Sequence, residues 1–227
     1  MFDTLDLPPL MGYQQESPQP ADQPEGGSGD YVMYLSDPDV ACNLQATISP
    51  TKYYKRVADG FERSSYPLIG WWTVGAGLDM SSLDAVYESL QVMETANEVI
   101  IRGAPLEAPR GQVRRNGQVF RPVKRRWVCI DIDDYEVSTP FIPGEDMHTD
   151  RAILQKLVRD CLPEDWHHAG FVAQWSAGAG FTKDNDLYYP GPTTQVKVHL
   201  WFLLFNGVED HQLRKYFKKN APMVDTD

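Results

Sequence analysis

The sequence predicts an α+β domain in which helices cover one face of an antiparallel sheet, and three observations support this prediction. Of the 227 residues, 42% are hydrophobic, which is enough for one sizeable packed core. Apolar residues recur at helical spacing in some stretches and alternate or form short runs in others, as they do in strands. From Cys129 onward, the predicted elements follow the order β-α-β-loop-β-α and end with the start of a further strand.

The first part of the chain combines a polar tail with short predicted elements. Residues 1–30 are rich in Pro, Gln, Glu, Asp and Gly and bury too little apolar surface to offset the entropy of ordering, so we expect a disordered tail. Order is predicted from Tyr31, where YVMYL is typical of a short strand. A short helix begun by Ser49 and Pro50 and an aromatic strand over residues 66–75 are predicted next.

A helix over residues 83–96 completes a predicted N-terminal αβ module that spans residues 31–97. Ser81 or Ser82 supplies the side-chain cap of this helix. Its inner face is formed by apolar residues at helical spacing, which are Leu83, Val86, Tyr87, Leu90 and Met93.

The predicted core spans residues 98–227 and forms one domain, residues 31–227, together with the module. Its predicted elements are strands over residues 98–103, 125–133, 170–176 and 196–205 and helices over residues 149–162, capped by Thr149, and 209–219. The final segment, APMVDTD, opens another strand, so we expect the natural core to continue past residue 227. This order is compatible with an RRM-like or ferredoxin-like sheet.

The charge is strongly negative overall but unevenly distributed. A net charge of −11 argues against a passive nucleic-acid coat, which needs a basic surface. One basic stretch nevertheless holds eight cations opposed only by Glu107, namely Arg102, Arg110, Arg114, Arg115, Arg121, Lys124, Arg125 and Arg126. A second basic cluster consists of Arg214, Lys215, Lys218 and Lys219. Five arginines, Arg102, Arg110, Arg114, Arg115 and Arg121, are candidates to bind nucleic-acid phosphates; the alternative is a solvated loop and a solvated helix face.

The sequence also favours a cytoplasmic protein. Cys42, Cys129 and Cys161 are odd in number and lack metal-ligand spacing, which is typical of reduced, buried thiols. No run of 18 apolar residues predicts a membrane span, and MFDTLDLPPL lacks the basic and apolar regions of a signal peptide.

Paired carboxylates mark the end of the first buried strand. Asp131 and Asp133 are two residues apart, so their side chains share one face of the strand with Cα atoms roughly 6.6 Å apart. Such carboxylates repel each other unless a divalent cation with oxygen ligands lies between them. Asp134 is expected to point the other way or to begin a turn. The alternative is a strand that runs out into a polar turn, and the pattern occurs in polymerases, nucleases and sugar-nucleotide transferases.

A second candidate group lies on the strand VKVHLWF. Lys197 and His199 share the face opposite the aliphatic residues, and two such donors make a phosphate site plausible. Ser176 ends the preceding strand and can donate to a phosphate, although it equally fits an ordinary turn serine. Asp225, after Val224, can add a third carboxylate to the acidic pair.

These motifs together resemble the archaeo-eukaryotic primase superfamily, especially the primase-polymerases of phages and plasmids. The matching segments, within about residues 98–227, are Ile130-Asp131-Ile132-Asp133, then Ser176 with Val198-His199, then Val224-Asp225. The resemblance implies that Asp131, Asp133 and Asp225 hold two Mg²⁺ or Mn²⁺ ions and that His199, assisted by Lys197 and Ser176, contacts the triphosphate of the incoming nucleotide. Two departures are the long loop between Ala177 and Lys197 and the end of the chain two residues after Asp225.

The expected function is therefore a DNA-dependent primase or polymerase in mobile-element replication, active in the host cytoplasm. Its expected partners are a single-stranded DNA template, nucleoside triphosphates and a helicase in the same parent chain or in trans. Three alternatives stay open. A rolling-circle replication initiator would use Tyr216 and Lys219 but lacks a paired-histidine strand, because Leu200-Trp201 follows His199. A sugar-nucleotide transferase leaves His199 and the basic stretch unexplained, and a non-catalytic origin- or primer-binding module leaves the three acids unexplained.

Overall fold

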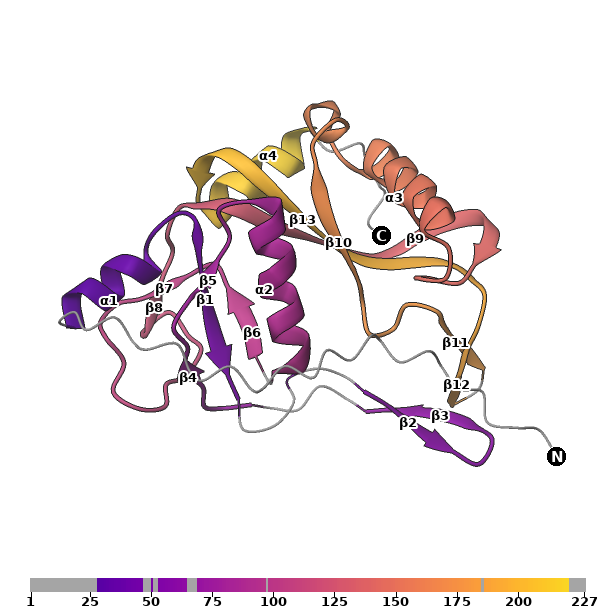
Figure 1. Ribbon diagram of the computed structural model, residues 1–227, viewed down its shortest axis with the longest axis horizontal. Coiled ribbons are helices and arrows are strands. Elements are labelled where there is room, and N and C mark those ends of the chain that lie inside the picture. The colour runs from indigo at the N-terminus through magenta and orange to yellow at the C-terminus, as the bar shows by residue number, and fades with distance from the viewer. Residues whose placement is uncertain are drawn as a thin grey trace.

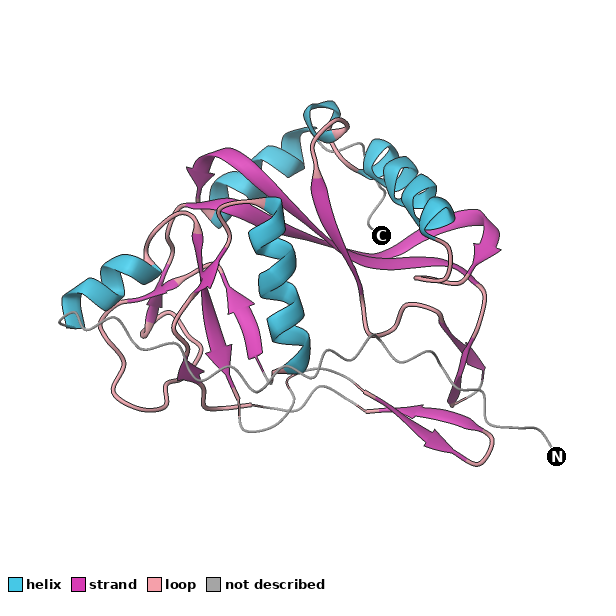
Figure 2. Cartoon of the chain, viewed as in Figure 1, coloured by secondary structure: helices cyan, strands magenta, loops and turns pink. Residues whose placement is uncertain are grey.

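The computed structural model describes residues 28–46, 50, 53–64, 69–96, 98–184 and 186–220. Within these ranges the fold is α+β, as predicted, with four α-helices and antiparallel strand pairs (Figures 1 and 2). The expected disordered tail lies outside the described residues up to position 27, whereas residues 28–30 belong to a helix. None of the described helices is long and apolar enough to cross a membrane.

The N-terminal module is built around one short, buried strand. This strand, β1 (Val40–Gln45), pairs with β4 (Thr73–Val74) and β5 (Leu78–Asp79) and, on its other side, with β6 (Glu98–Ile101). A two-stranded ribbon, β7 (Ala104–Pro105) and β8 (Phe120–Arg121), brings together the ends of the loop over residues 106–119, which is part of the basic stretch.

The helix α2 (Leu83–Thr95) joins the module to the core. Ser82 caps it by accepting a hydrogen bond from the Ala85 amide, as predicted. Its buried residues Val86 and Leu90 pack in one cluster with Trp127 and Trp201 of the core sheet, and Figure 1 shows the helix standing between the two sheets. The helix therefore holds the two parts of the chain against each other.

The core is a three-stranded antiparallel sheet in the order β10-β13-β9. Its strands are β9 (Arg125–Phe141), β10 (Phe171–Trp175) and β13 (Thr193–Val208), and its helical segments are α3 (Met147–Cys161), the 3₁₀ turn η1 (Glu164–Trp166) and α4 (Asp210–Asn220). Residues of α3, η1 and α4 pack on one face of this sheet, against alternate β13 residues from Val196 to Phe202 that are 0–1% exposed. That alternation places Lys197 and His199 on the opposite face of β13, next to Trp201, which packs against α2.

A third sheet, in the order β11-β12-β3-β2, corrects two predictions. Its strands are β2 (Tyr54–Val57), β3 (Gly60–Arg63), β11 (Phe181–Asp184) and β12 (Leu187–Pro190). The helix predicted after Ser49 and Pro50 is wrong, since residues 54–63 form a hairpin, and the predicted loop after Ser176 contains another hairpin. The Tyr54 ring stacks on Phe181 at 4.1 Å, and this contact between distant segments outweighs the local sequence pattern.

Three further predictions of local structure are corrected. YVMYL belongs to the helix α1 (Ser28–Leu35), which buries Leu35 completely. Of the strand predicted over residues 66–75, only β4 and a bridge from Trp72 to Val113 are formed within the described residues. Asp146, rather than Thr149, caps α3, because its carboxylate accepts the amide hydrogen bonds of both His148 and Thr149.

Candidate functional site

The polar face of the core sheet brings together most of the residues singled out in the sequence. Asp131 of β9 lies directly across from His199 of β13, and Gln174 of β10 lies on the other side of His199 in the same row. The distance from His199 Nε2 to Asp131 Oδ1 is 3.3 Å, and the two side chains are 34% and 60% exposed. The row is thus polar, accessible and continuous across the three strands.

The second carboxylate lies at a β-bulge in the same strand. Ile132 pairs with Val198 and Tyr135 pairs with Val196, so Asp133 and Asp134 together stand opposite the single residue Lys197. Ile132 and Tyr135 both pack against the helix-covered core, whereas Asp133 and Asp134 are exposed. Of the two alternatives for Asp134, the turn is not formed, because the strand continues past the bulge to Phe141.

Ser176 and Lys197 form the other end of this surface. The Ser176 amide donates to the Lys197 carbonyl at 3.0 Å, and the Ser176 carbonyl accepts from the Ala179 amide in a turn. A Cβ atom on Gly178 would lie 3.8 Å from Lys197 Cδ and 3.1 Å from the Tyr54 hydroxyl, so the hairpin β2–β3 borders the surface here. Ser176 is therefore both a turn residue and a neighbour of the candidate phosphate site.

The third predicted carboxylate, Asp225, lies outside the described residues. Asp131 and Asp133 offer the oxygen ligands that Mg²⁺ and Mn²⁺ prefer, and both remain exposed enough to exchange water for a cation. Within the ranges that the structure describes, no three His, Cys, Asp or Glu side chains are grouped closely enough to hold a metal ion. The two aspartates thus fit part of a divalent-cation site and need a further ligand.

Two polar residues beside this row, Gln174 and Glu94, were not predicted from the sequence. The Gln174 side-chain amide donates to Glu94 of α2 at 3.4 Å, which places a third acidic side chain beside the strand β10. Gln174 precedes Ser176 by two positions, so strand alternation was the signal that could have identified it.

The five arginines predicted to contact phosphates have different environments. Arg102 is 15% exposed and fully engaged, with an ion pair to Asp210 and hydrogen bonds to the Trp127 and Val208 carbonyls. Burial lowers the pKa of the Arg102 guanidinium, and the Asp210 carboxylate opposes that change. The other four, Arg110, Arg114, Arg115 and Arg121, are exposed.

Two of the exposed arginines have partners within the chain. Arg114 lies over the ring of Trp71 at 5.0 Å from its centroid, and Trp71 is 52% exposed, whereas its neighbour Trp72 is core. Arg121 donates to the Ser36 hydroxyl at 3.3 Å. The sequence did not distinguish the exposed tryptophan of the pair from the buried one.

The tyrosine on which a rolling-circle initiator would depend lies away from the polar face. Tyr216 packs with Trp166 in the cluster on the helix-covered face of the sheet. Its hydroxyl accepts from Trp166 Nε1 at 3.3 Å and donates to Asp165 at 3.1 Å. Burial raises the pKa of Tyr216; the hydrogen bond from Trp166 opposes this rise and Asp165 adds to it, and the net rise opposes formation of a nucleophilic phenolate. His199 is on the opposite face of the sheet, so the two groups do not form one site.

Comparison of the chain with protein-family models, with curated proteins and with solved structures finds no match.

Proposed function

We propose that the polar face of the β10-β13-β9 sheet is the active site of a primase-polymerase that transfers nucleotides from nucleoside triphosphates to a 3′-hydroxyl. The observation that carries the proposal is the row in which Asp131 faces His199 at 3.3 Å, with Asp133 and Lys197 at the next bulged position. Acidic and basic groups side by side suit a reaction that needs both a cation site and a triphosphate site.

The topology supports an RRM-like core for this site. β9 and β10 both run antiparallel to β13, so they are parallel to each other, with β13 between them and α3 connecting them, which is a split β-α-β unit. Repetition of that unit through α4 would add a strand at the free edge of β9. Asp225 is the carboxylate that the sequence assigns to such a strand, beside Asp131.

In the proposed reaction, the 3′-oxygen of the primer forms a bond to the α-phosphorus of the nucleotide. The bond from that phosphorus to the pyrophosphate oxygen breaks, and the proton of the 3′-hydroxyl passes to water. Two divalent cations held by Asp131, Asp133 and Asp225 would stabilise the attacking and leaving oxygens. His199, Lys197 and the Ser176 hydroxyl would neutralise and orient the triphosphate.

His199 has a second role in this arrangement. Because its Nε2 lies beside Asp131 Oδ1, the imidazole also orients that carboxylate. A carboxylate with a polar partner on one side has fewer free rotamers, which favours binding of a cation at a defined place.

The test is primer extension by the Asp131→Asn variant, with Asp134→Asn as a matched control. Both changes remove one exposed negative charge from the same strand, but only Asp131 lies against His199. We expect Asp131→Asn to abolish incorporation and Asp134→Asn to retain it. The unfolding free energy of Asp131→Asn should change by less than about 1 kcal/mol, since an exposed ion pair contributes little. Wild-type extension by Asp131→Asn would refute the proposed site.

A further inference from the structure

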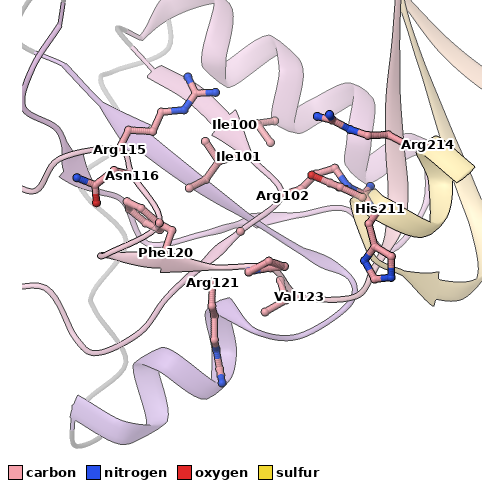
Figure 3. Close-up of a pocket in the computed structure, with 14 residues that line it drawn as sticks. Ile100, Ile101, Arg102, Arg115, Asn116, Phe120, Arg121, Val123, His211 and Arg214 are labelled. Atoms are coloured by element: carbon pink, nitrogen blue, oxygen red, sulfur yellow. The ribbon is translucent and has the colours of Figure 1, made fainter.

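A cavity of about 600 Å³ lies between the N-terminal module and the helix α4. One wall is the strand β6 and the loop that leads to β8, and the other is the N-terminal half of α4 (Figure 3). Its volume is within the range of small-molecule sites and exceeds the needs of a single inorganic anion.

Some of the arginines that line this cavity form ion pairs or hydrogen bonds within the protein, and others do not. Arg102 is neutralised by Asp210, and Arg121 points away from the cavity toward Ser36. Arg115 and Arg214 extend toward each other across Ile100, as Figure 3 shows, and neither forms an ion pair within the described part of the chain. Two like charges that face one cavity favour an anion between them.

The rest of the lining is suited to a ligand with an apolar, planar part. Ile100, Ile101, Phe120 and Val123 supply apolar surface, and Asn116 offers an amide that can both donate and accept hydrogen bonds. Gly117 leaves open space, since a Cβ atom there would meet nothing within 4 Å. An anionic group at the arginines and an apolar floor beside them match the two halves of a nucleotide.

We propose that this cavity is a nucleotide-binding site distinct from the Asp131–His199 row, with the phosphate between Arg115 and Arg214 and the base on the apolar floor. The phosphate can belong to a free nucleoside triphosphate or to the 5′-terminal nucleotide of a single strand, and both present the same chemistry to the two arginines. The site needs no metal, so it goes beyond the proposed nucleotidyl transfer and does not depend on it.

The experiment measures binding to the full chain in EDTA, which removes divalent cations from any carboxylate site. The probes are ATP and a short oligonucleotide with or without a 5′-phosphate. Their binding is measured by calorimetry or by fluorescence anisotropy. Saturable binding of ATP identifies the free nucleotide as the source, and binding of the oligonucleotide that requires its 5′-phosphate identifies the strand end. Failure of both probes to bind overturns the proposal.

Matched variants locate the bound phosphate. Arg115→Ala and Arg214→Ala should each weaken binding about tenfold or more, since each removes a charge-assisted contact. Lys124→Ala, close to the strand β8, and Lys218→Ala in the same helix α4 remove equal charge outside the cavity and should leave binding within about twofold. Equal weakening by these controls would show diffuse attraction to basic residues and overturn the proposal.

A further variant separates this proposal from the proposed active site. Asp131→Asn should lose primer extension but keep the binding measured in EDTA. Loss of that binding in Asp131→Asn would assign the nucleotide to the row on β9 and β13 and overturn the second site. Retained binding together with retained extension would instead contradict the proposed active site alone.

Discussion

Arg125 is expected to stabilise the fold rather than to bind nucleic acid, although it lies in the basic stretch. Its side chain is 0% exposed and donates to the carbonyls of Leu35, Asp37, Arg102 and Gly103. Burial lowers the pKa of Arg125 to about 10, which still leaves the guanidinium charged at neutral pH. This one residue therefore ties α1 and the end of β6 to the first residue of β9.

Replacement of Arg125 by Met keeps the apolar length of the side chain and removes every donor. Each hydrogen bond from a charged donor contributes about 1.5–3 kcal/mol, but the desolvation of the guanidinium offsets part of their sum. We expect a loss of about 3–5 kcal/mol in the free energy of unfolding, typical of a broken buried ionic network. Because Arg102 and Gly103 line the cavity beside α4, nucleotide binding should weaken too.

The assay is urea denaturation followed by tryptophan fluorescence, with Arg126→Met as the control. Arg126 pairs with Asp39 at the surface, where the side chains are 43% and 29% exposed, so its loss should cost about 1 kcal/mol or less. A loss in Arg125→Met no larger than that in Arg126→Met would refute the structural role.

Three further predictions concern titration, salt and nucleotide binding. Burial raises the pKa of both Cys42 and Cys129 from 9.0 to about 12, so the thiols of the unfolded chain lose their protons at lower pH than those of the folded chain. The free energy of unfolding should therefore fall between about pH 9 and 12, by up to about 1.4 kcal/mol per pH unit for each thiol. Urea denaturation at several pH values measures this fall. A Cys42→Ala variant whose free energy of unfolding falls as steeply with pH as that of the wild type would contradict the prediction. Single-stranded DNA binding through the four exposed arginines of the basic stretch should show a log–log salt slope of roughly −3, and replacement of Arg114 and Arg115 by Ala should flatten it by about 1.4. Anisotropy titrations measure the slope, and an unchanged slope in the double variant would mean that single-stranded DNA binds to other residues. His199→Ala should raise the KM for nucleotide in primer extension while template affinity is unchanged, and equal losses of both would contradict the assigned role.

Hydrophobic patterning predicted the elements whose burial is decided locally. The helices α2 and α3 and the strands β9, β10 and β13 each have one apolar face that packs in a core cluster. The hairpin from Tyr54 to Arg63 was predicted as a helix because its stabilising partners, Phe181 and Tyr188, are distant in the sequence. A short segment without a complete apolar face takes its structure from such contacts.

The candidate site shows the same division between local and long-range information. Strand alternation was sufficient to predict that Lys197 and His199 face away from the aliphatic core. The basic stretch was less informative, since charge alone did not reveal that Arg102 and Arg125 satisfy backbone carbonyls inside the protein. The cavity between Arg115 and Arg214 joins segments that only the folded chain brings together.

The pairing of Asp131 with His199 depends on the register between β9 and β13, which neither strand sets by itself. A slip of one residue would place Asp131 opposite a core position such as Val198 or Leu200, and it would turn a carboxylate toward the apolar cluster or expose the aliphatic residues. Val198 and Leu200 are both 0% exposed, so this slip is strongly disfavoured. The hydrophobic face of the sheet thereby sets the position of the polar row, and the bulge at Asp133 and Asp134 takes up the extra residue without moving Asp131.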